Sequence, residues 1–251
     1  MSIDYHGLVT QGLARQIAEK LREAILGGRL QVDERLPTEG ELAVRFDVSR
    51  PTVREALKRL AAQNLVRSRR GPSGGTFVTR PTRDETRAMV ATSAALLVSM
   101  DEFSLDEVAE ARQELELVCC RLAAQRRGDA HLAALSAEVE LQRSAALSDE
   151  EFCASDVRFH QQLVAAAGNP ALEFAAAGLI DSLQPAVNLV VFRFRDRAQV
   201  AVQHARLLRA LAARDGEAAC AALRQYMNAL RKQYRHAQAA RSGDGSMQER
   251  A

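Results

Sequence analysis

Apolar positions in the first sixty residues recur every three or four places, which is the period of amphipathic helices. Three segments show this pattern: 8–26, 39–46 and 50–63. The pair Gly27-Gly28 follows the first segment and favours a helix end there. The sequence therefore predicts three helices, of which the last two are separated by only a few residues.

The residues that precede the second and third helices are typical of helix N-termini. Thr38 and Glu41 have the spacing of a capping box, in which a hydroxyl and a carboxylate satisfy the first backbone N–H groups. Ser49 ends the short turn 47–49 and is a favoured N-cap residue. Two abutting helices with this turn between them are expected to form a helix-turn-helix.

Beyond the third helix the pattern changes to short β-prone segments. Residues 65–69 alternate in part, 71–75 are rich in glycine, and 76–79 favour a strand. A glycine-rich hairpin after a helix-turn-helix makes a winged helix-turn-helix, whose second helix can lie in the major groove while the wing touches the flanking backbone. We assign this domain to residues 1–80.

The remainder of the chain shows long Ala- and Leu-rich helical periods and few strand signals. Residues 81–86 are interpreted as a linker, 87–237 as an all-helical bundle, and 238–251 as a disordered tail because they offer no apolar face. The predicted fold class is mainly α, with a winged helix-turn-helix and an all-α second domain of six or seven helices. Breaks between these helices are expected at 101–104, 128–129, 146–148, 168–170, 184–185 and 214–216.

The net charge of +2 conceals an asymmetry. Residues 1–83 hold 15 Lys and Arg against 9 Asp and Glu, whereas residues 84–251 hold 19 against 23. A basic first third indicates a polyanionic partner at one end of the chain. We find no signal-peptide core and no apolar stretch of membrane length, so a cytoplasmic protein without a membrane partner is expected. The four cysteines lack zinc-knuckle spacing and are expected to be reduced and buried.

Basic and hydroxyl side chains gather at the start of the third helix and on the predicted wing. A helix N-terminus with such side chains suits phosphate oxygens and the acceptor atoms of guanine. A merely solvated face of a small structural domain is the alternative, but it does not explain why capping box, turn, basic helix start and basic wing follow in order. The candidate DNA-binding residues are Ser49, Arg50, Thr52, Arg54, Lys58 and Arg69, with Arg59, Arg67 and Arg70 adding to the charge.

The segments LPTEGELA, VSRPTVREAL and GGTFV resemble the DNA-binding domain of GntR-type regulators. The resemblance implies a homodimer on a short palindromic operator in double-stranded DNA. It further implies that Arg50 and Arg54 contact bases or phosphates, that Thr52 supports them, and that the wing at Gly74-Gly75 reaches the minor groove. Many relatives carry a DNA-contacting arginine where this chain has Gly40, so its base preference is expected to differ.

The second part of the chain is similar to the all-helical, FCD-type ligand-binding domain of the FadR-like branch of these regulators. The similarity lies in segments 107–124, 156–174 and 203–227. An aminotransferase-like second domain would need several hundred more residues. The resemblance implies a regulator, repressors being common in the family, that responds to a small organic or sugar acid and dimerises through this domain. Effector binding is expected to shift the helical packing and thereby the spacing of the two DNA-binding domains.

Asp156 and His160 stand four apart on one predicted helix and thus share a face that a divalent metal can bridge, while His204 lies on another helix. By spacing alone, such residues are more often a surface pair or a core hydrogen bond. The resemblance implies zinc, nickel or manganese at these three residues. Tyr226 stands where many relatives have a further histidine, and a phenol is a poor ligand at neutral pH. We predict a three-ligand site completed by water or effector; loss of the metal is the alternative, with Tyr226 donating a hydrogen bond to the effector.

Several arginines are candidates for holding an anionic effector. The resemblance implies that Arg112 binds its carboxylate, whereas spacing alone favours a solvated pair of Arg112 with Glu116. Three alternating arginines either flank an anionic ligand or belong to a solvated helix end or a contact between the domains: Arg193, Arg195 and Arg197.

Two other classes of protein compete with the regulator. A metal-dependent hydrolase or lyase would use the Asp/His/His set to activate water. However, no motif positions a second carboxylate as a general base, so no enzyme is expected. A nucleoid-type DNA binder would spread its positive charge along the whole chain, and the acidic second domain argues against it.

Overall fold

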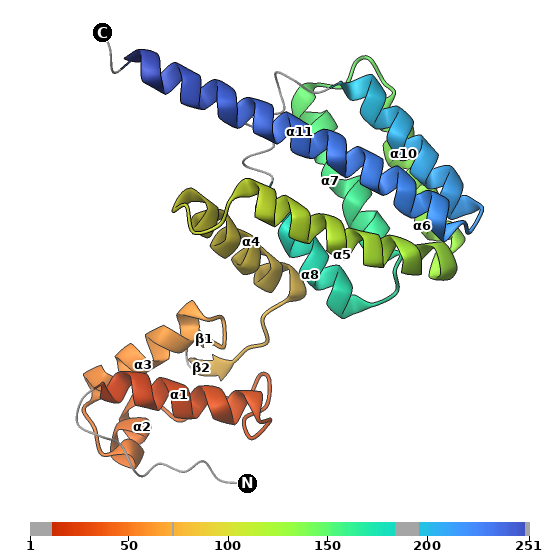
Figure 1. Cartoon of the computed structure of the whole chain (residues 1–251). Helices are drawn as coiled ribbons and strands as arrows, with labels where there is room; N and C mark the ends of the chain where they lie inside the picture. Colours follow the sequence, from red (N-terminus) through yellow and green to blue (C-terminus); the bar gives the residue numbers. More distant parts are fainter. Residues whose placement is uncertain (1–11, 72, 184–195, 249–251) are drawn as a thin grey trace. The chain divides into compact units, whose positions relative to one another are not determined.

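Helix caps define the first part of the computed structural model, which describes residues 12–71, 73–183 and 196–248. Thr38 and Glu41 form the predicted capping box: the Thr38 hydroxyl accepts from the Glu41 amide at 3.3 Å, and the Glu41 carboxylate accepts from the Thr38 amide at 2.7 Å. Ser49 is the N-cap of the third helix, as expected. The helices are α1 (Leu13–Leu26), α2 (Glu39–Phe46) and α3 (Arg50–Ala62), as Figure 1 shows. The predicted start of the first helix, at residues 8–11, lies outside the described residues.

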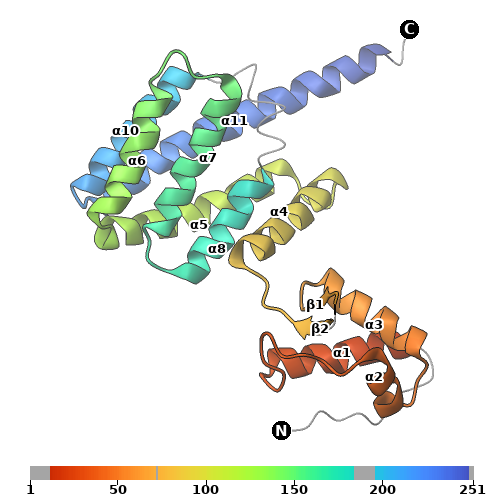
Figure 2. The same ribbon diagram turned by 180° about the vertical axis from the view of Figure 1, so that it is seen from behind.

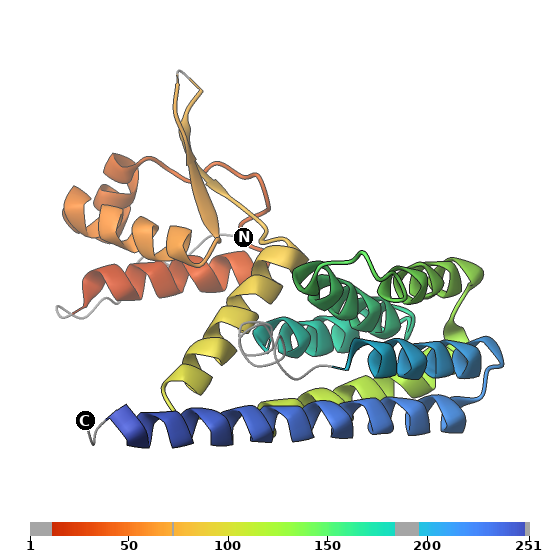
Figure 3. The same cartoon turned by 90° about the horizontal axis from the view of Figure 1, so that it is seen from above.

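A β-hairpin follows these helices. Strands β1 (Val66–Arg69) and β2 (Gly75–Val78) pair antiparallel, with Val66 opposite Val78. The hairpin projects from the helices as a narrow wing (Figure 3). Val66 and Val78 are buried with the apolar faces of α1, α2 and α3, so one core joins the base of the wing to the helix-turn-helix.

The second unit, from Arg83 onward, is all helical throughout its described residues. Ser104, Ser148 and Asn169 cap three of its helices at breaks that the sequence predicts. The helices are α4 (Arg83–Ser99), α5 (Leu105–Arg126), α6 (Asp129–Gln142), α7 (Asp149–Ala165), α8 (Pro170–Ser182), α10 (Arg197–Ala212) and α11 (Gly216–Gln248). The predicted fold class, a winged helix-turn-helix followed by an all-α domain, is therefore confirmed.

The helices of the second unit enclose one main core. Helices α6, α7 and α10 lie side by side (Figure 2), and α11 runs along α5 (Figure 3). Phe152, Phe159 and Leu163 of α7 are fully or almost fully buried in this core. Because α7 contacts α5, α6 and α8, its inward face is screened from water on several sides.

Two boundary predictions need correction. Helix α4 begins at Arg83, inside the segment 81–86 that was interpreted as a linker. Helix α11 continues to Gln248, so the prediction of a disordered tail is wrong over 238–248. That segment lacks an apolar face, but extending an existing helix requires no new nucleation. The break expected at 184–185 lies outside the described residues, and none of the described helices is long and apolar enough to cross a membrane.

Candidate functional site

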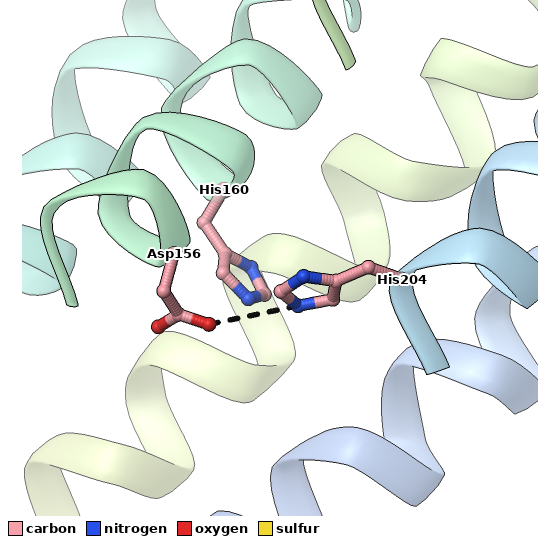
Figure 4. A group of neighbouring side chains, drawn as sticks. All are labelled: Asp156, His160 and His204. Carbon is pink, nitrogen blue, oxygen red and sulfur yellow. Dashed lines mark ion pairs between the residues drawn. The ribbon is translucent and has the colours of Figure 1, made fainter. Parts of the chain in front are cut away.

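Three buried side chains of the second unit point toward one another (Figure 4). Asp156 and His160 project from the same face of α7, as their spacing predicts, and His204 projects from α10. One potential ligand atom from each residue lies within 4.8 Å of the other two. The structure thus brings together the three residues that the sequence nominated as metal ligands.

Each histidine is oriented by a hydrogen bond at Nδ1. His160 Nδ1 lies 2.5 Å from Glu116 Oε2 on α5, and His204 Nδ1 lies 2.8 Å from Gln142 Oε1 on α6. The Nε2 atom of His204 lies 3.6 Å from Asp156 Oδ1. The buried Nε2 atom of His160 has no hydrogen-bond partner in the described parts of the chain. Metal-binding histidines in proteins show this arrangement, with one nitrogen bound to an outer partner and the other directed at the ion.

Glu116 joins His160 to Arg112. Arg112 Nε donates to Glu116 Oε1 at 2.6 Å, and the two side chains are only 3% and 0% exposed. The i,i+4 pair therefore exists, but it is not the solvated pair that spacing alone favoured. Burial raises the pKa of Glu116, but attraction to His160 and Arg112 together with their hydrogen bonds outweighs it and holds the pKa below its ordinary value. Glu116 is thus a carboxylate that only accepts, and the proton it shares with His160 belongs to Nδ1.

Tyr226 of α11 contacts a candidate ligand directly. Its hydroxyl donates to both carboxylate oxygens of Asp156, at 2.8 and 3.0 Å, and its side chain is buried. The Phe159 ring stacks on His204 with centroids 4.0 Å apart and 9° between the planes. Tyr226 therefore orients the Asp156 carboxylate, while Phe159 orients the His204 ring.

Sequence reasoning missed Gln142 and the positioning role of Glu116. Glu116 is 44 residues from its histidine and Gln142 is 62 residues from His204, so no local spacing connects them. The only available signal was the i,i+4 relation of Glu116 to Arg112, which placed both on one helix face. Gln142, the last residue of α6, offered no such signal.

The predicted DNA-binding residues of α3 gather around its N-terminus. Ser49, Arg50, Arg54 and Lys58 are exposed and Thr52 is half-buried. The Ser49 and Thr52 hydroxyls lie 2.8 Å apart within the cap. These side chains share one accessible surface, which we call the α3 surface.

Acidic neighbours hold two of the basic side chains on this surface. Arg54 Nη2 lies 2.9 Å from Glu39 Oε2, and Lys58 Nζ lies 2.8 Å from Glu55 Oε1. The hydrogen bond from Arg54 lowers the pKa of Glu39. Exposed pairs of this kind contribute only about 0–1 kcal/mol, so a phosphate can replace Glu39 as the partner of Arg54 at little cost.

The local packing of the wing explains why glycine stands at positions 74 and 75. A Cβ atom at Gly74 would lie 2.6 Å from the Arg69 carbonyl oxygen, and one at Gly75 would lie 2.6 Å from Arg35 Nε. Arg69 lies over the Phe77 ring, 4.7 Å from its centroid, and 3.4 Å from Asp33. The glycines therefore permit the wing fold, whatever contact they make with DNA.

Of the three alternating arginines, Arg193 and Arg195 lie outside the described residues. Arg197 donates to Asp149 Oδ1 at 3.1 Å and to the Leu147 carbonyl oxygen at 2.7 Å, and it lies over the Phe152 ring. Arg197 thus connects the start of α10 to the start of α7 within the second unit, a contact that the sequence did not predict.

Comparisons with known proteins find a matching family for each of the two units. Residues 13–78 match the family described as bacterial regulatory proteins, gntR family, and residues 107–229 match the FCD domain. The chain is 32% identical to RmpR of Mycobacterium gastri over 83% of its own length and 75% of that protein. It is 28% identical to the HTH-type transcriptional repressor NanR of Cronobacter sakazakii, over 91% and 88% of the two chains. The fold is similar to that of Streptococcus agalactiae GntR, with a TM-score of 0.56, 24% identity, and 87% and 99% of the chains covered.

Proposed function

Because the chain belongs to the gntR family of bacterial regulatory proteins and carries an FCD domain, we propose that it is a metal-dependent, effector-responsive repressor. That it is a transcriptional regulator and not a hydrolase follows from its relatives. In the proposal, a homodimer binds a short palindromic operator through the α3 surface and the wing. Asp156, His160 and His204 hold a divalent zinc, nickel or manganese ion, and a small carboxylate completes its coordination.

One observation supports the metal proposal most directly: potential ligand atoms of Asp156, His160 and His204 converge inside the protein. Glu116 Oε2 and Gln142 Oε1 lie at hydrogen-bond distance from Nδ1 of the two histidines, so a neutral ring that donates there directs the lone pair of Nε2 toward the Asp156 carboxylate. Lone pairs and a carboxylate repel one another unless a cation lies among them. The residues therefore fit a divalent ion, which would supply open coordination positions for an anionic ligand.

Metal analysis of the purified full-length protein tests this proposal. The protein is prepared without chelators or a metal-binding tag, incubated with zinc, nickel or manganese, desalted and measured by mass spectrometry. Near-stoichiometric metal is expected, and His160→Ala should lose it. His131→Ala is the matched control, because His131 is a helix-capping histidine of α6 outside the cluster and should leave the metal content unchanged. A wild-type protein without metal overturns the proposed site.

The effector half of the proposal is tested through DNA binding. A duplex is selected from a random-sequence library with the metal-loaded protein, and its release is measured against a panel of small hydroxy acids and sugar acids. At least one acid should release the duplex from the wild type while leaving the His160→Ala complex intact. A panel that acts equally on both proteins contradicts a role for the metal in effector response.

A further inference from the structure

A chain of hydrogen bonds leads from the protein surface to His204. Arg158 donates to both oxygens of Glu138, at 2.7 and 2.9 Å. Ser155 Oγ lies 2.7 Å from Glu138 Oε2, and Gln142 Nε2 donates to Ser155 Oγ at 3.1 Å. The Gln142 oxygen lies 2.8 Å from His204 Nδ1. Glu138 lies on α6 and Ser155 on α7, and both Ser155 and Gln142 are buried.

The donor and acceptor of each hydrogen bond in this series follow from the outermost acceptor, Glu138. Both oxygens of Glu138 accept from the Arg158 guanidinium, and the Ser155 hydroxyl donates to one of them, so Glu138 is the acceptor at the outer end. Ser155 then offers only a lone pair to Gln142, which must present its N–H group to Ser155 and its oxygen to His204. An amide oxygen only accepts, so the proton of the neutral His204 ring lies on Nδ1.

From this we infer that Glu138 and Ser155 are positioning residues that set the tautomer of His204 through the Gln142 amide. The opposing influence is Asp156, whose Oδ1 atom lies 3.6 Å from His204 Nε2 and would accept a proton placed there. That distance is longer than a hydrogen bond, as expected when Nε2 carries a lone pair. The significance for metal binding rests on the proposed function; the tautomer itself does not.

Nitrogen-15 NMR of the full-length, metal-free protein tests the inference at alkaline pH, where imidazoles are neutral. The wild type should show His204 protonated at Nδ1. In Ser155→Ala the Gln142 amide can turn, and the proton should move to Nε2, toward Asp156. His160 is an internal control, because its partner Glu116 only accepts and its Nδ1 proton should remain in every variant. Ser155→Thr keeps the hydroxyl and should retain the wild-type tautomer.

A second variant covers the case in which Ser155→Ala fails to fold. Glu138→Gln has the same shape, but its amide presents either an oxygen or an N–H group to Ser155, so the chain no longer has one direction. His204 should then give signals of both tautomers. The inference is overturned if wild-type His204 is protonated at Nε2, or if folded variants leave its tautomer unchanged.

Zinc titration gives a quantitative readout beside the spectrum. Zinc binds only the His204 tautomer that is protonated at Nδ1 and has its lone pair at Nε2. The zinc dissociation constant should therefore rise by the inverse of the fraction of molecules with this tautomer. If one-tenth of the molecules keep it, zinc should bind about tenfold more weakly. A change of the His204 tautomer without the corresponding loss of zinc affinity contradicts the link between the tautomer and the metal site. If the wild type binds no metal while the tautomers behave as stated, the proposed function fails and the positioning role stands.

Discussion

At the scale of single residues, Gly40 leaves room for the Arg50 guanidinium beside α2. A Cβ atom at Gly40 would sit 3.3 Å from Arg50 Nη2, so the side chain packs almost directly on the α2 backbone. The resemblance implies an arginine at this position in many relatives, whereas here the Arg50 guanidinium of α3 lies beside Gly40.

We therefore expect Gly40→Ala to separate stability from DNA binding. Alanine favours helix over glycine, which should stabilise the first unit by about 0.5 kcal/mol, whereas the displaced Arg50 should weaken binding to the selected operator several-fold. Amide hydrogen exchange in α2 and DNA titration measure the two effects. Val44→Ala is the control: Val44 is an exposed α2 residue, 82% accessible, so operator affinity should not change. Unchanged affinity in Gly40→Ala would show that the position of Arg50 beside α2 does not matter for operator binding.

The common face of Asp156 and His160 was predictable because a spacing of four residues on one helix fixes it, whereas their grouping with His204 came from the family resemblance. The outer partners were not predictable, because Glu116 and Gln142 reach the histidines only through the packing of α5 and α6 against α7 and α10. Tyr226 shows the same limit: its position was identified, but its hydrogen bonds to Asp156 depend on how α11 lies.

At the scale of elements, an ion-pair cluster connects the start of α5 to the middle of α11. Asp106 accepts from Arg231 at 2.9 and 3.0 Å and from Arg235 at 2.9 Å. These hydrogen bonds lower the pKa of Asp106 to about 2. Since the folded-state pKa lies below the unfolded value of about 3.9, the cluster stabilises the fold above that pH and is lost as the pH falls through about 2.

The prediction is that Asp106→Asn destabilises the protein near neutral pH and that the difference from wild type disappears between about pH 4 and pH 2. Asp106 is 38% exposed, so after solvent screening we expect about 1 kcal/mol. Denaturant unfolding at several pH values measures it. Asp129→Asn, in the first turn of α6 with its carboxylate 3.9 Å from Arg127, should have a smaller effect. A difference that persists at pH 2 contradicts the ion-pair origin.

Element boundaries were predictable where a side chain fixes them. Thr38, Ser49, Ser104 and Ser148 each accept a backbone N–H at the start of a helix, which is a local interaction. The C-terminal end of α11 was not predictable in this way, because no capping residue or apolar period marks it.

At the scale of the whole molecule, the two units differ in how far apart their contacting residues lie in sequence. In the first unit, α1, α2, α3 and the wing all fall within residues 13–78. In the second unit, α11 packs along α5, and Arg231 lies 125 residues beyond Asp106. The first unit can therefore form from local sequence, whereas the second needs α11, which is far in sequence from α5.

Truncation tests this difference. A chain ending at Arg214 lacks α11 and with it the buried Leu223, Tyr226, Met227 and Leu230. Losing each large apolar side chain costs about 2–5 kcal/mol, and the sum exceeds the usual stability of a domain. Hydrogen exchange should show protection in α1–α3 but not in α5–α10. A chain ending at Arg235 keeps these residues and the Asp106 cluster and should protect both units. Protection of α5 in the shorter chain would refute this dependence.

The position of α11 also matters during synthesis. While the ribosome translates the residues between α5 and α11, the winged helix-turn-helix can already be folded, whereas α5 lacks its partner and leaves apolar side chains uncovered. Under the proposed function, nascent or prematurely terminated chains would then occupy operators without responding to an effector. Proteases that recognise exposed apolar segments would remove such chains, so the first unit would persist only in chains that include α11.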